Sequence, residues 1–417
     1  MKHKYLPMDW NLIQLGSVLK KVRRPVDIDP DEEYRQIGIR SHGKGIFHKE
    51  PVLGRDLGNK SIFWVKPGDF VLNIVFAWEG AVAVVTDAEL GMCGSHRFPT
   101  FVVNPDKLEL DYLLLYFKSQ EGIVQLESVS PGGAGRNKTL SQSDFLRLKI
   151  PLPPIDEQRR ITKVLRDADA HIAHVEAQIE AAQAVKRGVM QRLFTYGLAD
   201  EETPTKHTRI GEIPAGWEVG QLGQLLHSIE AGRSPQALDR PAEDDEWGVL
   251  RVSAVRPEGL QAHENKAVID PQHINSAYEI HEGDVLISRA NTFELVGLVT
   301  FVEDTPPRLM LSDKTLRLVV NRNFSDSRFL SYFLQSEPMR QQIIDNATGT
   351  SAGMKNISQD SILRLPVACP DLGEQREIAA ILSAHDATIR SLQVEAESLR
   401  EVKRGLMQKL LSGEVRV

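Results

Sequence analysis

An internal repeat constrains the fold of this chain more than any other feature of its sequence. Residues 156–198 align without a gap with residues 373–415, at a constant offset of 217 residues. Both copies contain Glu-Gln-Arg near the start and Lys-Arg-Gly near the end. A repeat of this length predicts two copies of one architectural unit.

The repeat continues upstream of these segments. Ser95 and Arg97 match Ser312 and Lys314 at the same offset. Gly68-Asp69 and Trp10 match Gly283-Asp284 and Trp217 at offsets of 215 and 207, as expected if surface loops near the start of each copy differ in length. The predicted organisation is a first domain (1–154), a first spacer helix (155–198), a linker (199–216), a second domain (217–370) and a second spacer helix (371–417).

A chain of 417 residues is too long for a single hydrophobic core of ordinary size, so we expect more than one domain. The hydrophobic fraction of 41% is typical of a globular protein. Cys93 and Cys369 have no metal-ligand spacing. The N-terminus lacks an apolar signal core and no run of about 18 apolar residues occurs, so we expect a cytoplasmic protein.

The net charge of −7 is unevenly distributed. Lys and Arg number 20 against 18 Asp and Glu in residues 1–150, but 16 against 25 in residues 200–370. DNA binders usually have a basic excess, since phosphate contacts supply most of the affinity. If this chain binds DNA, we expect a partner to add positive surface.

Two long amphipathic helices are predicted from apolar residues spaced alternately four and three apart. The first series is Ile161, Leu165, Ala168, Ile172, Val175, Ile179, Ala182, Lys186, Val189 and Leu193. The second series is Ile378, Leu382, His385, Ile389, Leu392, Ala396, Leu399, Lys403, Leu406 and Leu410. This period of 3.5 residues is that of a coiled coil. Because the connection crosses a whole domain, an antiparallel pair is the simplest arrangement.

Lys186 and Lys403 interrupt the two series at equivalent positions. Each is either a lysine that sets the register of the helices or part of a Lys-Arg-Gly patch that docks a partner. Gly188 and Gly405 cost about 1 kcal/mol each in a helix interior. Their recurrence suggests a close approach of backbones. The residues that we predict to contribute to the helical spacer or to contact a partner subunit are Glu157, Gln158, Arg159, Lys186, Arg187, Gly188, Glu374, Gln375, Arg376, Lys403, Arg404 and Gly405.

The domains themselves mix short strand-like runs with helix-like runs, which predicts an α+β fold. Residues 131–140 resemble a P-loop, but Asn137 stands where glycine is required, so we exclude a nucleotide triphosphate site. The Gly-rich stretch is either a DNA-contacting loop or a flexible connector. Polar and basic candidates for DNA contacts, each equally consistent with a solvated surface residue, are Arg40, Ser41, His42, Lys44, Arg97, Arg136, Asn137, Lys138, Arg251, Ser253, Arg256, Arg289, Asn291, Lys314, Lys355 and Asn356.

No catalytic constellation is evident in the sequence, and no Gly-rich cofactor loop follows a strand. Three classes of function are considered: a DNA-reading subunit, a coiled-coil scaffold whose heads bind proteins, and a nuclease fused to a recognition unit. A gel-shift salt series separates the first two classes, since DNA reading should weaken steeply as salt rises, and a metal-dependent cleavage assay tests the third. We expect no catalysis, no metal and no bound cofactor.

The chain resembles the specificity subunit of type I restriction-modification systems over essentially its whole length. The resemblance is carried by the helix entries PLPPIDEQRRI and CPDLGEQREI, the helix ends KRGVMQRLFTYGL and KRGLMQKLLSGE, and the domain entry IGEIPAGWEVGQLG with its counterpart LPMDWNLIQLG. The passages SQSDFLRLKIPLPP and SQDSILRLPVACP belong to the same pattern. His385 and Cys369 replace residues that are usually apolar in the family.

The resemblance implies two target-recognition domains joined by two helices that form an antiparallel coiled-coil spacer. Each domain would read one half of a bipartite, asymmetric DNA site through the major groove. The helices would set the gap between the halves. The expected partners are double-stranded DNA, two methyltransferase subunits, which use S-adenosylmethionine, and ATP-dependent restriction subunits. No membrane association is expected.

Overall fold

The computed structural model describes residues 6–58, 60–132, 138–199, 202–351 and 354–417. Its contacts divide the chain into two compact units. Unit 1 comprises residues 1–176 and 394–417, and unit 2 comprises residues 177–393. Each unit therefore contains one β-rich head together with parts of both long helices, whereas the sequence predicted heads and helices as separate segments.

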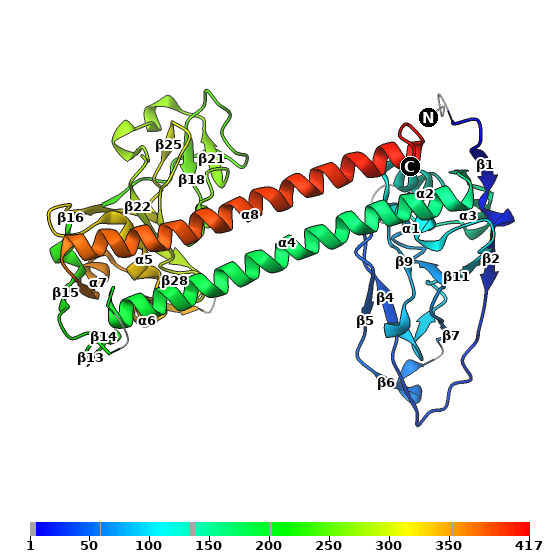
Figure 1. Cartoon of the computed structure of the whole chain (residues 1–417), viewed down its shortest axis with the longest axis horizontal. Helices are drawn as coiled ribbons and strands as arrows, with labels where there is room; N and C mark the ends of the chain where they lie inside the picture. Colours follow the sequence, from blue (N-terminus) through cyan, green and yellow to red (C-terminus); the bar gives the residue numbers. More distant parts are fainter. Residues whose placement is uncertain (1–5, 59, 133–137, 200–201, 352–353) are drawn as a thin grey trace. The chain divides into compact units, whose positions relative to one another are not determined.

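The head of unit 1 is built on a four-stranded antiparallel sheet in the order β2-β11-β8-β9. The strands are Leu19–Val22, Thr100–Val103, Phe70–Leu72 and Val82–Val84. Phe70, Leu72, Val82 and Phe101 enter a core with the helices behind the sheet. The strand-like runs at 70–75, 81–85 and 99–103 are therefore strands, shortened at their ends (Figure 1).

The head of unit 2 repeats this sheet in the order β16-β26-β22-β24. Its strands are Leu226–Ala231, Thr315–Val320, Val285–Ser288 and Val299–Phe301. Val285, Ile287, Val299 and Leu318 lie in the matching core. The order of corresponding strands is the same in both heads, so the duplication seen in the sequence extends to topology.

Each helix-like run of a head forms two helices that meet at a serine. In unit 1 these are α1 (Leu110–Lys118) and α2 (Gln120–Ser128), and the Ser119 side chain accepts a bond from the Gly122 N–H at the start of α2. In unit 2 they are α5 (Ser327–Gln335) and α6 (Glu337–Asp345), where Pro338 follows Ser336. A serine with extended backbone ends one helix, and a serine cap or a proline in the first turn favours the start of the next. The helix is therefore broken although the hydrophobic pattern of the sequence continues across the serine.

The remaining elements close the heads and carry the loops. In each head one antiparallel strand pair joins the start of the head to its end. This pair is β1 with β12 in unit 1 and β15 with β29 in unit 2. The bounds of the elements not yet given in unit 1 are β1 Asn11–Gln14, β3 Glu33–Tyr34, β4 Ile37–Ile39, β5 Ile46–His48, β6 Val52–Leu53, β7 Ile62–Trp64, β10 Cys93–Ser95, α3 Gln142–Arg147 and β12 Lys149–Leu152. In unit 2 they are β15 Glu218–Gln221, β17 Ala237–Leu238, β18 Gly248–Leu250, β19 Val255–Arg256, β20 Gly259–Leu260, β21 Asn265–Val268, β23 Ala290–Asn291, β25 Leu309–Met310, β27 Thr348–Ser351, β28 Met354–Asn356, α7 Gln359–Leu363 and β29 Pro366–Cys369.

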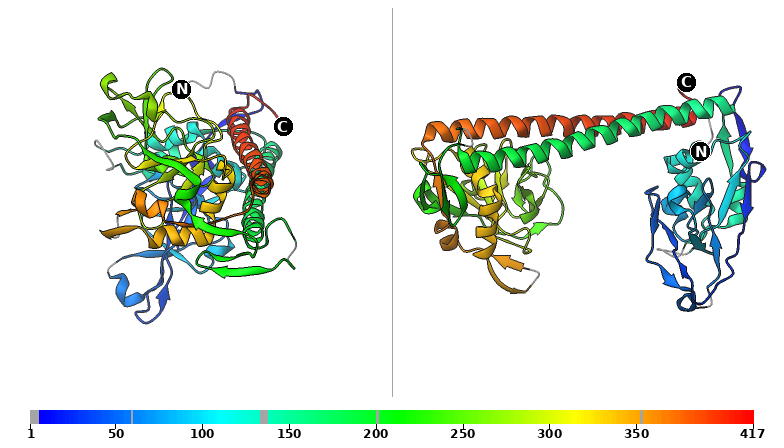
Figure 2. Two further views of the ribbon diagram at one scale, coloured as in Figure 1. Left: turned by 90° about the vertical axis from the view of Figure 1, so that its left-hand side faces the viewer. Right: turned by 60° about the horizontal axis from the view of Figure 1, so that its bottom comes forward.

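The two long helices are α4 (Ile155–Tyr196) and α8 (Leu372–Ser412), each continuous in Figures 1 and 2. Every residue of both predicted apolar series is buried or half-buried, including Lys186 and Lys403. Within each unit the two helices run antiparallel, since contacts pair early residues of one helix with late residues of the other. The predicted antiparallel helix pair is confirmed.

The predicted linker is not a loose connector. Residues Thr205–Thr208 (β13) and Gly211–Pro214 (β14) form an antiparallel hairpin. Ile210 and Ile213 are buried in the core of unit 2. The many polar, Gly and Pro residues of this segment suggested a linker. The burial of these two apolar side chains instead packs the hairpin against unit 2. No helix in the described part of the chain is long and apolar enough to cross a membrane.

Candidate nucleic-acid interface

The turn between β4 and β5 presents the first group of predicted DNA contacts. His42 has a positive φ of 59° and Gly43 one of 63°, which is the left-handed conformation that a tight turn requires. The turn is anchored to the next loop, because the N–H of His42 donates to the carbonyl of Glu79 at 2.7 Å. The Ser41 hydroxyl donates to the Glu79 carboxylate at 2.7 Å. This anchoring leaves Arg40, His42 and Lys44 exposed on one loop.

A groove of about 520 Å³ runs beside this turn. The Arg40 guanidinium lies 5.2 Å from the centre of the Phe47 ring, and Lys49 lies 5.8 Å from that of Phe98. Within the described residues Arg40 and Lys44 form no ion pair. Cations that are held over aromatic faces and lack carboxylate partners can approach phosphates or base edges.

Lys138 lies against the short helix η3, Ala77–Glu79, whose Glu79 also anchors the β4–β5 turn. Its ammonium lies 4.8 Å from the centre of the Trp78 ring and 2.7 Å from Oε1 of Glu127. Lys138 is therefore already paired, and it would have to leave Glu127 to contact DNA. Arg136 and Asn137 lie outside the described residues.

In unit 2 five of the predicted residues gather around β23 and β28. Asn291 pairs with Lys355 across these strands, and Ala290 pairs with Asn356. Arg289 Nε donates to Oδ1 of Asn356 at 3.3 Å. The backbone N–H of Arg289 donates to the carbonyl of Lys314 at 2.9 Å, which places the exposed Lys314 beside this group. No pattern in the sequence indicated that residues 289, 314 and 356 meet.

The same backbone connection exists in unit 1. The N–H of Ile74 donates to the carbonyl of Arg97 at 3.0 Å, and the N–H of Leu140 donates to the carbonyl of Ile74 at 2.8 Å. In unit 2 Ile357 donates to Arg289, the residue that itself donates to Lys314. Both heads thus place one exposed basic residue, Arg97 or Lys314, against the segment that leads out of the central sheet.

Arg251, Ser253 and Arg256 lie apart from that group, in a part of unit 2 that we call the acidic lobe (residues 239–282). The acidic lobe contains ten Asp and Glu against four Lys and Arg. Arg251 Nη2 lies 2.8 Å from Oδ1 of Asp239, and Ser253 donates to Glu264 at 2.6 Å. Arg256 donates to the carbonyl of Ser253 at 3.2 Å. All three side chains therefore have polar partners within the chain, and their contact with DNA stays a prediction.

The two lysines of the helices have carboxylate partners that the sequence did not reveal. Lys186 Nζ lies 2.6 Å from Oδ1 of Asp386. Lys403 pairs with Asp169, and both lysines and both aspartates are related by the offset of 217. The first alternative, a lysine that sets the register, agrees with this geometry.

Gly188 and Gly405 do not approach another backbone within the described chain. A Cβ placed at either position would meet nothing within 4 Å. The expected close approach is therefore wrong for contacts inside the molecule. Arg187, Arg404 and both glycines are exposed, as are Arg159 and Arg376 near the starts of the helices. By contrast Glu157, Gln158 and Gln375 are buried and Glu374 is half-buried, so their side chains are not open to a partner.

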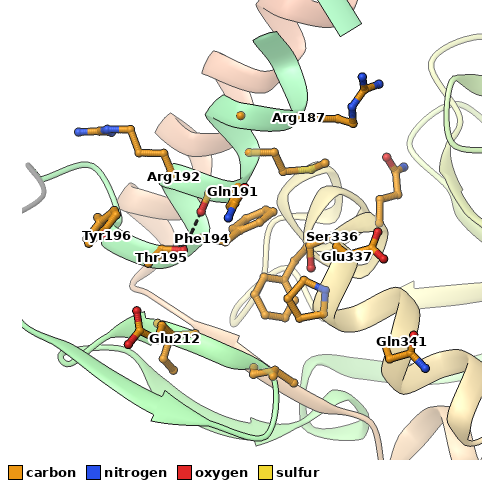
Figure 3. Close-up of a pocket in the computed structure, with 17 residues that line it drawn as sticks. Arg187, Gln191, Arg192, Phe194, Thr195, Tyr196, Glu212, Ser336, Glu337 and Gln341 are labelled. Carbon is orange, nitrogen blue, oxygen red and sulfur yellow. Dashed lines mark hydrogen bonds between the residues drawn. The ribbon is translucent and has the colours of Figure 1, made fainter. Parts of the chain in front are cut away.

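A pocket of about 1,070 Å³ in unit 2 adjoins Gly188 (Figure 3). Its walls are the end of α4, the hairpin β13–β14 and the start of α6. Phe194, Ile213 and Phe333 form part of an apolar lining, and Arg187 and Arg192 stand at its rim. The pocket combines apolar and cationic groups but brings together no nucleophile, base and oxyanion donor.

The described residues contain no group of three or more His, Cys, Asp or Glu that could hold a metal. The two cysteines are also unsuited to nucleophilic chemistry. Burial raises the pKa of the Cys93 thiol to about 11 and that of Cys369 to about 12, so both are protonated at neutral pH.

Sequence reasoning missed Phe47, Lys49 and Trp78, which shape the exposed face of unit 1. The available signal was Phe47 followed directly by His48 and Lys49. It also missed Asp169 and Asp386, although their equivalence under the offset of 217 could have indicated a shared role.

Comparison with known proteins agrees with this architecture. The family described as Type I restriction modification DNA specificity domain matches residues 7–183 and 214–401. The type I restriction enzyme MjaVIII specificity subunit of Methanocaldococcus jannaschii is 26% identical, with 99% of this chain and 94% of the relative aligned. The EcoEI specificity subunit of Escherichia coli is 24% identical, with 95% and 81% aligned.

Two solved structures share the fold. One, from a study of complex assembly and conformational transition of the type I R-M system, gives a TM-score of 0.61 at 18% identity and covers 99% of this chain and 100% of its own. The other, the S subunit of the type I restriction-modification system of M. genitalium, gives 0.55 at 15% identity, with 98% of each chain covered. The match to the family on both copies of the repeat shows that the chain belongs to the type I restriction-modification specificity subunits, which recognise DNA sequence.

Proposed function

We propose that each head reads one half of a bipartite, asymmetric DNA site through the major groove. The observation that carries this proposal is the shared connection at Ile74 and Arg289, which presents an exposed cation in both heads. Basic side chains on loops that a sheet holds rigidly can position a protein on phosphates and reach base edges.

The two half-sites should differ in sequence, because equivalent positions of the two heads offer different chemistry. Arg40 follows β4 and lies over an aromatic ring, whereas Arg251 follows β18 and is paired with Asp239. Unit 1 would read DNA through the β4–β5 turn and its groove. Unit 2 would read DNA through Arg289, Asn291, Lys314, Lys355 and Asn356 and keep the acidic lobe away from phosphates.

We also propose that α4 and α8 set the spacing between the half-sites. Support comes from their continuity, since α4 alone has 42 residues and α8 has 41. At 1.5 Å per residue a helix of this length extends about 60 Å. The apolar series and the two Lys–Asp pairs fix the register of one helix against the other, which a spacer of defined length requires.

The surfaces around Gly188 and Gly405 are the proposed docking sites for two methyltransferase subunits. Exposed glycine in the interior of a helix lowers helix stability, both copies have it, and no neighbour among the described residues lies within 4 Å of a Cβ placed there. The pocket beside Gly188 adds apolar surface that a partner could bury. In this proposal S-adenosylmethionine and ATP bind to the methyltransferase and restriction subunits and not to this chain.

The test uses the chain co-expressed with its methyltransferase subunit. The purified complex is incubated with DNA and labelled S-adenosylmethionine, and the modified sequences are mapped. A split, asymmetric target is expected, and binding should weaken steeply as salt rises. Methylation without a defined target, or with a single continuous one, would contradict the proposal.

A further inference from the structure

In each unit a buried glutamine joins the long helix to its head. The Gln158 side chain is fully buried near the start of α4. Its Oε1 accepts a hydrogen bond from the backbone N–H of Glu109 at 2.8 Å, and its Nε2 donates to the carbonyls of Lys107 at 3.0 Å and Pro153 at 2.9 Å. Glu109 is the N-cap residue, immediately before α1. One amide group therefore ties the first turn of α4 to the first helix of the head.

Gln375 makes the equivalent contacts in unit 2. Its Oε1 accepts from the N–H of Asp326 at 2.8 Å, and its Nε2 donates to the carbonyls of Phe324 at 3.1 Å and Pro370 at 2.9 Å. Each of these partners lies 217 residues after its counterpart in unit 1. The loops of the heads differ in length and chemistry, whereas this set of bonds is the same, so the joint between head and helix has stayed fixed.

A tryptophan reinforces each joint. The indole N–H of Trp10 donates to Glu157 at 3.0 Å, and that of Trp217 donates to Glu374 at 3.3 Å. A buried carboxylate needs several donors to offset its desolvation. Trp10 and Trp217 each supply one donor from the head to a carboxylate on the helix.

The remaining donors differ between the units. In unit 1 Arg416, near the end of the chain, donates to Glu157 at 2.7 Å and to both oxygens of Asp9 at 2.9 and 2.7 Å. These contacts raise the pKa of Arg416 and lower that of Asp9. In unit 2 the backbone N–H of Leu198 donates to Glu374 at 3.2 Å instead. The first joint therefore contains an ion pair, whereas no described residue forms one with Glu374 in the second.

We propose that Gln158, Gln375 and Arg416 are positioning residues that fix the orientation of each head on its helix. This inference rests on the proposed function. The fixed orientation would determine which spacings between half-sites the protein accepts. Inserting one base pair between two half-sites moves them apart by about 3.4 Å and rotates one against the other by about 35°. A head held by several bonds at the helix start cannot follow that rotation. A head that has lost some of them can.

The experiment uses the full complex with its methyltransferase subunit and compares Arg416→Gln, Trp10→Phe and Gln158→Leu with the unmodified chain. Arg400→Gln is the matched control. The Arg400 side chain is 43% exposed against 44% for Arg416 and also pairs with a glutamate of α4, Glu176, whereas its other ion pair is with Glu397 on its own helix. Affinity is measured on duplexes with the mapped spacer, with one base pair added or removed, and with one half-site mutated.

For Arg416→Gln and Trp10→Phe we expect the preference for the mapped spacing to fall about tenfold, with the preference for the correct bases changed less than about twofold. Arg400→Gln should retain both preferences. Gln158→Leu should have the largest effect, and if it does not fold, the two milder variants decide. Wild-type spacing preference in Arg416→Gln and Trp10→Phe would overturn the inference. Absence of any split target for the unmodified complex would overturn the proposed function instead.

Discussion

Lys186 and Asp386 form an ion pair inside the apolar seam of the two helices, with 2.6 Å between Nζ and Oδ1. The other oxygen of Asp386 accepts from the Tyr332 hydroxyl at 2.6 Å, and the lysine also lies over the Tyr332 ring. Burial, together with this hydrogen bond, raises the pKa of Tyr332, so that the phenol remains a donor. A polar pair within an apolar seam disfavours other registers, because a shift would leave both charges without partners.

Removing one member of this pair should destabilise the protein. Lys186→Met leaves the Asp386 carboxylate with Tyr332 and Ser383 nearby but without a cation, and we expect a loss of about 1–3 kcal/mol in the free energy of unfolding. The exchanged pair, Lys186→Asp with Asp386→Lys, should recover part of that loss. Urea unfolding of Lys186→Asp, Asp386→Lys and the exchanged pair gives the coupling energy, and additive effects of the two single changes would show that the pair contributes nothing.

Replacing the helix glycines Gly188 and Gly405 by alanine should raise the stability of the chain but lower its affinity for the methyltransferase subunit. Gly188→Ala and Gly405→Ala should each stabilise the helix by about 1 kcal/mol, since the new methyl group meets no neighbour in the chain. The same variants should bind the methyltransferase subunit more weakly if its backbone packs against these positions. Calorimetry measures both quantities, with Ala184→Ser, also exposed on α4, as the control. Unchanged partner affinity in both glycine variants would exclude these surfaces as docking sites.

Changes in one head should affect one half-site. Arg40→Ala should alter recognition only of the half read by unit 1, and Lys314→Ala only of the half read by unit 2. A lost base contact should cost about 1–3 kcal/mol at one position, whereas a lost phosphate contact should lower affinity for all sequences and reduce the salt dependence. Competition binding with half-site variants distinguishes these outcomes.

Arg251→Ala serves as the control for that pair, since Arg251 occupies a position similar to Arg40 but is bound to Asp239. It should leave both half-site preferences intact. Equal loss at both halves in Arg40→Ala or Lys314→Ala would point to a general folding defect and would count against separate reading by the two heads.

The thiols should be inert in the native protein. Burial raises the pKa of Cys93 to about 11 and that of Cys369 to about 12, which favours the neutral form. At pH 8 the reactive thiolate is therefore scarce, and it increases only as the pH rises towards these values or the protein unfolds. A chromogenic disulfide reagent should react slowly at pH 8 and rapidly with two thiols in guanidinium. Fast reaction of both thiols in native buffer would contradict the burial.

Much of the architecture could be predicted because it depends on local periodicity. The series from Ile161 to Leu193 and from Ile378 to Leu410 were correct at each position, since a helix buries whatever its 3.5-residue period places on one side. The breaks at Ser119 and Ser336 were missed, because the hydrophobic pattern continues across them.

The candidate site was less predictable because its chemistry depends on distant partners. Arg40 and Arg251 look alike in the sequence, and only the fold shows that Asp239 is paired with the second. Lys138 likewise meets Glu127 and Trp78 through the folding of separate segments. The buried role of Gln158 could have been suspected from its repeat at Gln375, but its bonds to backbone groups leave no pattern in the sequence.

The most direct test of the account exchanges the reading surface of one head. The β4–β5 segment of residues 40–49 is replaced by the corresponding segment of a relative with a different target, and the complex with the methyltransferase subunit is mapped by methylation sequencing. The account predicts that one half of the split target changes while the other half and the spacing between them stay the same. A change in both halves, or an unchanged target, would contradict it.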